Sequence, residues 1–154
     1  MERMAALVPV PRQEIIRGLL PGLRTVTGVG GAYLFGSALR AEFRPDSDID
    51  LGIVASDGAD VFQVIGDVES ACRPVGLHLV HAMVLNAAST IFAFHVVSTG
   101  LLIYCVDDDA VTALIEGVAI HHEEVGPPYY RALRMIYGGR TEACDGRRAA
   151  ATKA

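Results

Sequence analysis

Two aspartates, Asp48 and Asp50, are separated by one residue at the start of an apolar run that ends at Val54. Successive side chains of a strand point to opposite faces, so both carboxylates would lie on one face. Mg²⁺ usually takes one or two protein carboxylates and completes its shell with water and substrate phosphate oxygens. The pair therefore predicts a magnesium site with Asp48 and Asp50 as its ligands.

A Gly-Ser pair, Gly36-Ser37, follows the preceding apolar run, ten residues before Asp48. Gly36 permits a close approach of the backbone to a ligand. Ser37 is expected to begin a helix whose free N–H groups and positive dipole end can hold a phosphate. Arg40 and Arg44, in the intervening loop, could also reach a phosphate, and a solvated loop face accounts for them equally well. These residues predict a triphosphate next to the metal.

The elements that must position these groups are strands alternating with helices, which argues for an α/β or α+β fold. The strand that ends at Phe35 and the strand that starts at Asp48 can lie side by side, so that the phosphate and metal groups face the same space. Strands are expected at 32–35, 48–54, within 77–85 and at 101–106. Helices are expected at 12–20, 37–43, 60–72, about 88–100, from 107 to near 127, and about 129–137. Pro21-Gly22 is expected to end the first of them, and Pro127 is expected to break the helix that starts at 107.

The order Gly36-Ser37, ten residues, Asp48-x-Asp50 resembles the signature of the polymerase-beta-like nucleotidyltransferase superfamily. Within it, the chain is similar to the minimal nucleotidyltransferases, such as the MntA antitoxins that are paired with HEPN-domain toxins. The resemblance covers about residues 30–106. It implies a small mixed sheet flanked by helices, with Gly36 and Ser37 on the β- and γ-phosphates of ATP and the catalytic Asp48 and Asp50 on Mg²⁺.

The resemblance also implies a third carboxylate on a later strand, which would ligate the catalytic metal and help to deprotonate the attacking hydroxyl. No Asp, Glu, Lys or Arg occurs from Pro74 to Val106, and the family's strand pattern puts His81 at the first aspartate position. A neutral imidazole is a poor ligand for Mg²⁺, but it can act as a base at neutral pH. Three roles for His81 stay open. It is a strand histidine hydrogen-bonded in the core or at an interface, a member of a degenerate site, or a replacement catalytic base.

Two functions of different classes follow from the resemblance. The first is an enzyme that transfers AMP from ATP to a hydroxyl, above all a tyrosine of a partner HEPN toxin, and so acts as an antitoxin. The second is a catalytically degenerate binding module that neutralises its partner by contact alone. Transfer of a nucleotide to an aminoglycoside-like small molecule is a third reading, disfavoured because such enzymes usually carry an additional substrate-binding domain.

Length and charge restrict the other possibilities. The 154 residues predict one domain at 1–138 and a flexible C-terminal tail at 139–154. The net charge of −5 disfavours non-specific binding of nucleic acid, which usually needs a clustered basic patch. Three widely spaced cysteines, with no CxxC pair, suggest neither a disulfide framework nor a zinc site.

Hydrophobicity bears on location and partners. We expect no targeting segment at the N-terminus, because Glu2, Pro9 and Pro11 come before any signal-peptide apolar core could form. We expect no membrane span, because Gly76, Gly100 and three histidines interrupt the long uncharged run. The cysteine pattern fits a cytoplasmic protein best. The apolar fraction of 51% is high for a solitary chain of this size. It therefore predicts a surface covered by a partner protein or by a second copy of the chain.

Overall fold

Four strands form one mixed sheet in the computed structural model, which describes residues 11–40, 47–73 and 79–136. The strand order is β3-β2-β1-β4. The central strand β1 runs antiparallel to both β2 and β4, and β2 runs parallel to β3. The strands are β1 (Val29–Phe35), β2 (Ile49–Ala55), β3 (Val80–Val84) and β4 (Leu101–Cys105). The predicted small mixed sheet of an α/β fold is confirmed.

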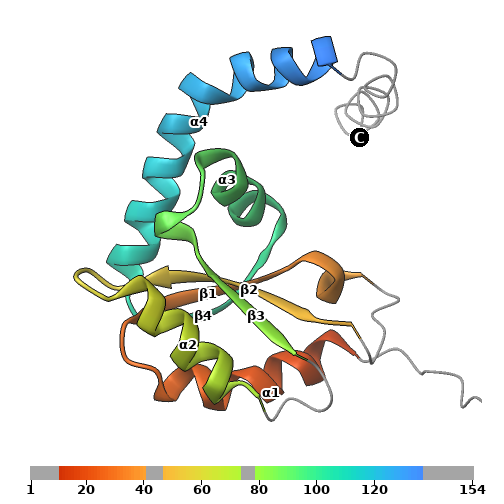
Figure 1. The fold of residues 1–154 in the computed structure, drawn as a ribbon. Coiled ribbons are helices and arrows are strands. Elements are labelled where there is room, and N and C mark those ends of the chain that lie inside the picture. Colours follow the sequence, from red (N-terminus) through yellow and green to blue (C-terminus); the bar gives the residue numbers. More distant parts are fainter. Residues whose placement is uncertain (1–10, 41–46, 74–78, 137–154) are drawn as a thin grey trace, which may run out of the picture.

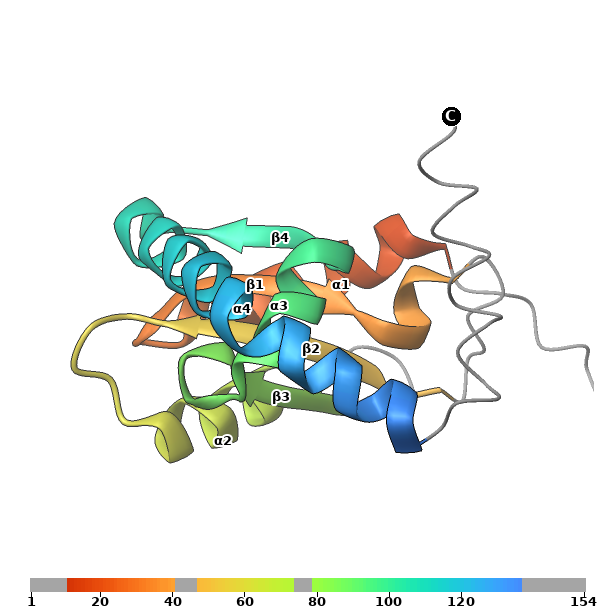
Figure 2. The same cartoon turned by 90° about the horizontal axis from the view of Figure 1, so that it is seen from above.

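Helices cover both faces of this sheet, two on each side (Figure 1). Two short 3₁₀ helices, η1 and η2, follow β1 and β3. The view from above shows that α3 and α4 cross the same face of the sheet (Figure 2). The helices are α1 (Arg12–Thr25) and α2 (Val61–Ala71) on one face, α3 (Thr90–Thr99) and α4 (Asp108–Ile136) on the other, η1 (Gly36–Leu39) and η2 (Leu85–Ala87).

The core is thickest between the sheet and the α1/α2 layer. Strand β1 is buried along its whole length because helices lie over both of its faces. Leu34 and Leu51 on the sheet and Leu23 on α1 belong to one cluster and are completely buried. Burial of each such side chain contributes about 1.5–3 kcal/mol, so this layer fixes the sheet on which the candidate site stands.

The predicted end of the first helix at Pro21-Gly22 is wrong, because α1 continues through Pro21 to Thr25. A proline inside a helix removes one backbone hydrogen bond, here to the carbonyl of Arg17. Arg17 is exposed, so water can satisfy that carbonyl. Leu23, one turn past Leu19, is buried in the core and holds the last turn of the helix in place.

Gly22 provides a test of this packing. A Cβ on Gly22 would lie 2.6 Å from the carbonyl oxygen of Ala71 on α2, whereas a Cβ on Gly66 would meet nothing within 4 Å. We expect Gly22→Ala to lower the free energy of unfolding by about 1–2 kcal/mol, since overpacking pushes α1 off α2. Gly66→Ala should raise it by about 1 kcal/mol through helix propensity alone. Urea unfolding of both variants measures the difference, and a Gly22→Ala protein as stable as Gly66→Ala would contradict the packing.

The predicted break near Pro127 is also wrong, because α4 is a single helix from Asp108 to Ile136 with Pro127 and Pro128 inside it. The carbonyls that lose their donors belong to Glu123 and Glu124, which are exposed and can be hydrated. On the other side of the helix, the His122 ring stacks on Phe94 of α3 with centroids 3.6 Å apart. Contacts of this kind keep the helix continuous where its own backbone bonding is weakest.

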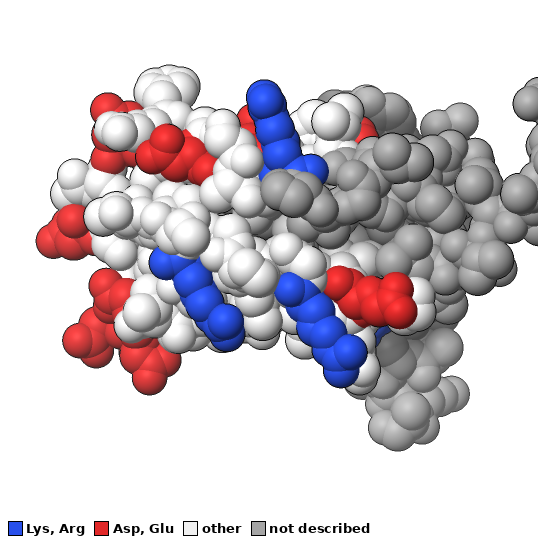
Figure 3. Space-filling model, turned by 90° about the horizontal axis from the view of Figure 1, so that it is seen from below, with Lys and Arg blue, Asp and Glu red and all other residues white. Residues whose placement is uncertain are grey.

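The surface bears on the expected partners. No helix within the described ranges is long and apolar enough to cross a membrane. On the face that α1 and α2 cover, the described Lys and Arg side chains stand apart from one another, and Asp and Glu gather toward one end (Figure 3). The expected tail at 139–154 lies outside the described residues.

Candidate active site

The candidate site lies where β1 ends and β2 begins. Asp48 immediately precedes β2, and Asp50 is directly opposite Phe35 in the antiparallel register of β1 and β2. Ile49 and Leu51 are buried toward α1 and α2. By alternation, Asp48 and Asp50 face the side of the sheet that carries α3 and α4. The predicted arrangement of two carboxylates on one face is thus present.

Gly36 has a backbone conformation and a packing position that favour glycine. Its φ is +74°, in the left-handed region that L side chains rarely adopt. A Cβ at this position would lie 2.7 Å from Oδ2 of Asp50. Gly36 therefore gives the Asp50 carboxylate the space in which it sits, in addition to the backbone approach predicted from the sequence.

The two aspartates differ in their surroundings. Partial burial raises the pKa of Asp50, the positive charge of a protonated His81 lowers it, and the negative charge of Asp48 raises it. Phe35, which is opposite Asp50 in the register of β1 and β2, has its ring edge-on to Phe92 of α3 with centroids 5.7 Å apart. Asp48, in contrast, has a side chain that is half exposed. A cation between the two carboxylates would relieve the unfavourable charge of the more buried one.

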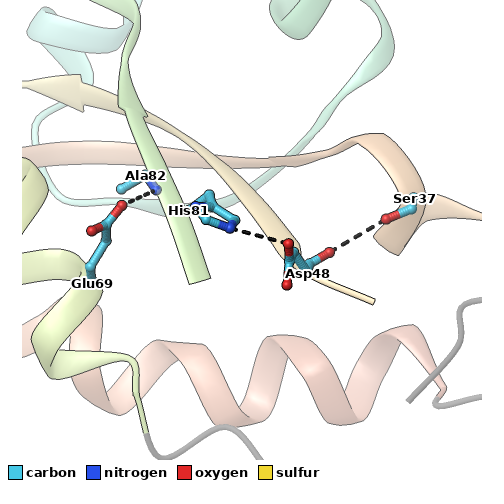
Figure 4. Close-up of polar contacts among 5 residues, drawn as sticks. All are labelled: Ser37, Asp48, Glu69, His81 and Ala82. Atoms are coloured by element: carbon cyan, nitrogen blue, oxygen red, sulfur yellow. Dashed lines mark hydrogen bonds and ion pairs between the residues drawn. The ribbon is translucent and has the colours of Figure 1, made fainter. Parts of the chain in front are cut away.

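His81 lies in this site and not in the core. It is opposite Asp50 in the parallel register of β2 and β3, and its Nε2 is 3.1 Å from Oδ2 of Asp48 (Figure 4). Its side chain is 56% exposed. This exposure contradicts a place for His81 in the core, while a place at an interface, a degenerate site and a replacement base stay open as predictions. The family-based alignment, which put His81 where a third carboxylate is expected, agrees with its position beside the aspartates.

Glu69 supports the strand that carries His81, a contact that no local sequence pattern indicates. Its Oε1 accepts a hydrogen bond from the backbone N–H of Ala82 at 3.1 Å, on the outer side of β3 (Figure 4). Since β3 is an edge strand, this N–H has no neighbouring strand to bond. The contact fixes β3 from α2 and so fixes the backbone next to His81.

The predicted phosphate-binding residues are placed in part. A short helix follows β1 as expected, but it is the four-residue 3₁₀ helix η1, which begins at Gly36 and not at Ser37. The Ser37 hydroxyl donates to the backbone carbonyl of Asp48 at 3.4 Å. At the other end of η1, Arg12 of α1 donates to the carbonyl of Leu39 at 2.7 Å, a contact that the sequence did not suggest. Arg40 is exposed at the end of this turn, and Arg44 lies outside the described residues.

The donor set fits one magnesium ion and leaves its shell to other ligands. Asp48 and Asp50 provide hard oxygen donors on one face, and the space that a Cβ of Gly36 would fill is kept free for the second carboxylate. No group of three or more His, Cys, Asp or Glu side chains that could hold a metal occurs among residues 11–40, 47–73 and 79–136. Water and substrate phosphate oxygens would therefore have to complete the coordination.

A strand ending in Gly-Ser, paired antiparallel with a strand that begins at Asp-x-Asp, defines the class of the protein as a nucleotidyltransferase fold. The family model "Polymerase beta, Nucleotidyltransferase" matches residues 20–109, more than half of the chain. The chain belongs to this family. No curated protein matches the sequence.

Solved structures show the same fold. A structure from Shewanella oneidensis is 17% identical with a TM-score of 0.56, and the match covers 80% of this chain and 95% of the other. A toxin-antitoxin with AMP-PNP is 18% identical with a TM-score of 0.51, and the match covers 86% of this chain and 99% of the other. A complex of tri-AMPylated Shewanella oneidensis HEPN toxin with MNT antitoxin is 20% identical with a TM-score of 0.50 and coverages of 86% and 99%. At these identities the likeness concerns the fold alone.

Proposed function

We propose that this chain transfers AMP from ATP to a tyrosine hydroxyl of a partner HEPN toxin and thereby acts as its antitoxin. The observation that carries the proposal is the pair Asp48 and Asp50 on one face, with Gly36 leaving room for the Asp50 carboxylate. Two structures of similar fold contain AMP-PNP in one case and an AMPylated HEPN toxin in the other. Family, site and these complexes together favour adenylyl transfer over other reactions of the family.

Each residue of the site would have its own role in this reaction. Asp48 and Asp50 would hold magnesium, which when bound would neutralise charge on the triphosphate and on the leaving pyrophosphate. Gly36 would leave the backbone open toward a phosphate. The His81 imidazole would fix the direction of the Asp48 carboxylate from the side of β3. The acceptor oxygen bonds to the α-phosphorus as the bond to pyrophosphate breaks, so catalysis would rest mainly on positioning.

A protein partner is also supported by the surface of α4. Val125, Tyr129 and Ile136 are between 40% and 69% exposed, although they continue the apolar stripe by which the first half of the helix packs on the sheet. Contiguous apolar surface of this kind is common where a protein binds another. It agrees with the partner predicted from the high apolar content of the chain.

A second candidate is a binding module that neutralises the toxin by contact without chemistry. The observation in its favour is the exposed His81 at the position where the resemblance implies a third carboxylate. A site with two aspartates and a histidine would bind nucleotide weakly or not at all if a third acidic ligand is essential.

Label transfer separates the two candidates. The chain is incubated with α-labelled ATP, Mg²⁺ and the protein encoded by the neighbouring gene, and the label on that protein is followed by gel autoradiography. The enzyme is expected to label the partner and to lower its toxicity. Loss of toxicity in a stable complex that carries no label would instead identify the binding module.

Replacing His81 by aspartate tests how the lack of a third carboxylate affects the binding of Mg²⁺. Without metal, we expect His81→Asp to have a lower melting temperature than wild type, since three carboxylates then repel one another. Addition of Mg²⁺ should raise the melting temperature of this variant by more than it raises that of wild type, since ligand binding stabilises the folded state. The affinity for Mg²⁺ should rise by about tenfold, because affinity follows the number of charged ligands. Differential scanning fluorimetry with and without Mg²⁺ measures both effects. His81→Asn is the control, and an equal response to Mg²⁺ in the two variants would contradict a metal site at this position.

A further inference from the structure

A second hollow lies at the other end of the sheet from the candidate active site. It has a volume of about 850 Å³ and is bounded by the turn after β2, the start of α3 and the first three turns of α4. Ala55, on its wall, is five residues along β2 from Asp50, which corresponds to about 16 Å at the usual rise of a strand. The volume is in the range of pockets that bind small molecules. The hollow is therefore separate from the carboxylate pair.

The hollow exists because the residues around it are small. Ala59 and Ala88 line it from the loops, and Ala110, Ala113 and Gly117 line it from α4. A Cβ added to Gly117 would meet nothing within 4 Å, so the space next to this helix is not filled by other side chains of the described chain. The apolar wall is thus available to the carbon skeleton of a ligand.

The charged groups of the hollow have one sign. Its charged lining residues are Asp57, Asp107 and Asp109, with His121 as a further titratable group and no Lys or Arg among the described residues that line it. Asp107 accepts a hydrogen bond from the N–H of Ala110, and His121 Nδ1 is 2.7 Å from the carbonyl of Gly117. Asp57, in the turn after β2, and Asp109, in the first turn of α4, are exposed, and no hydrogen bond or ion pair within the described part of the chain engages their carboxylates.

The helix ends around the hollow do not favour an anion. The N-termini of α2, α3 and α4 are directed to this region, and an uncapped N-terminus would attract negative charge. Each one is already capped by a side chain, namely Asp60 on the N–H of Gln63, Ser89 on that of Phe92 and Asp107 on that of Ala110. A bound anion would then meet capping side chains, two of them carboxylates, in place of free N–H groups.

We propose that this hollow binds a small organic cation, a linear polyamine whose ammonium groups lie at Asp57 and Asp109 and whose carbon chain lies on the alanine wall of α4. The amine nitrogens supply the positive charge that the lining lacks, and the methylene groups fit between the alanines. This inference goes beyond the proposed function, because it concerns another part of the molecule and does not depend on adenylyl transfer.

Calorimetric titration of the full chain with spermidine tests the proposal. We expect saturable binding of spermidine, weaker binding of the uncharged 1,4-butanediol and no binding of succinate. Asp57→Asn and Asp109→Asn should each weaken spermidine binding by up to about fivefold, the range expected for an exposed ion pair. Absence of spermidine binding to the wild-type chain at low salt would overturn the proposal.

Matched substitutions on α4 locate the binding. Ala113→Leu fills the hollow and should remove spermidine binding. Thr112 is the neighbouring residue, but its side chain does not line the hollow, so Thr112→Leu should leave spermidine binding unchanged. Both substitutions are at exposed helix positions and introduce the same good helix former, so folding is expected to be retained. Asp48→Asn/Asp50→Asn should bind spermidine as wild type does. Binding that survives Ala113→Leu but is lost in the double asparagine variant would place the amine at the carboxylate pair and overturn the proposal.

Discussion

Replacing Asp48 and Asp50 by asparagine is expected to abolish the transfer of AMP to the partner. An asparagine amide has nearly the shape of the carboxylate but no charge, so the site would lose the ligands predicted to hold magnesium. The charge stabilisation by a metal ion is worth several kcal/mol, and each 1.4 kcal/mol is about a factor of ten, so we expect a loss of about a thousandfold or more. The initial rate of labelling with α-labelled ATP measures the effect.

The same variant should be no less stable than wild type, which separates the loss of activity from misfolding. Burial and the charge of Asp48 raise the pKa of Asp50, so the folded protein disfavours the ionised carboxylate that is present near neutral pH. Removing both charges relieves this, and the melting temperature should stay equal or rise. Asp67→Asn, at an exposed acidic residue on α2, is the control and should retain full activity.

The result also decides between the two functions. An enzyme that silences its partner by modification must lose protection along with labelling in the double asparagine variant. If that variant binds and inhibits the partner as well as wild type does, adenylyl transfer is not the means of inhibition. The contact-only module would then be the better description of the chain.

The sequence predicted those features that depend on neighbouring residues. Helices are predicted at 60–72 and about 88–100, and α2 and α3 lie in these stretches, where Asp60 and Ser89 cap them through hydrogen bonds three residues along the chain. The strands next to Gly36 and Asp48 were recognised because apolar runs ended at residues with evident chemistry. These signals are contained in a few consecutive residues and need no knowledge of tertiary contacts.

The errors arose where distant residues decide the local structure. Pro21 was expected to end α1, but the burial of Leu23 in the core continues the helix. Pro127 was expected to break α4, but the stacking of His122 on Phe94 and other contacts between α3 and α4 stabilise the helix that contains it. In the site, Glu69 accepts a hydrogen bond from the backbone N–H of Ala82, 13 residues away in the sequence. Arg12 donates one to the carbonyl of Leu39, 27 residues away. No local pattern indicates such pairs.

Substituting alanine at Gly36 is expected to remove nucleotide transfer at a modest cost in stability. The φ of +74° costs an alanine about 1–2 kcal/mol. The Cβ would also lie 2.7 Å from Oδ2 of Asp50, which can move away because it is at the end of a side chain. The clash is therefore expected to displace the Asp50 carboxylate more than it destabilises the fold. A catalytic group displaced by about 1 Å can cost about a hundredfold in rate.

Gly58 offers a matched control for this prediction, because its φ is +75° and a Cβ there would meet nothing within 4 Å. Gly58→Ala should therefore lose about the same free energy of unfolding as Gly36→Ala, since both introduce the same backbone strain. Only Gly36→Ala should lose label transfer and the rise in melting temperature on adding Mg²⁺ and ATP. If both variants lost activity equally, general destabilisation would explain the effect. If neither did, the space kept free beside Asp50 would have no role in catalysis.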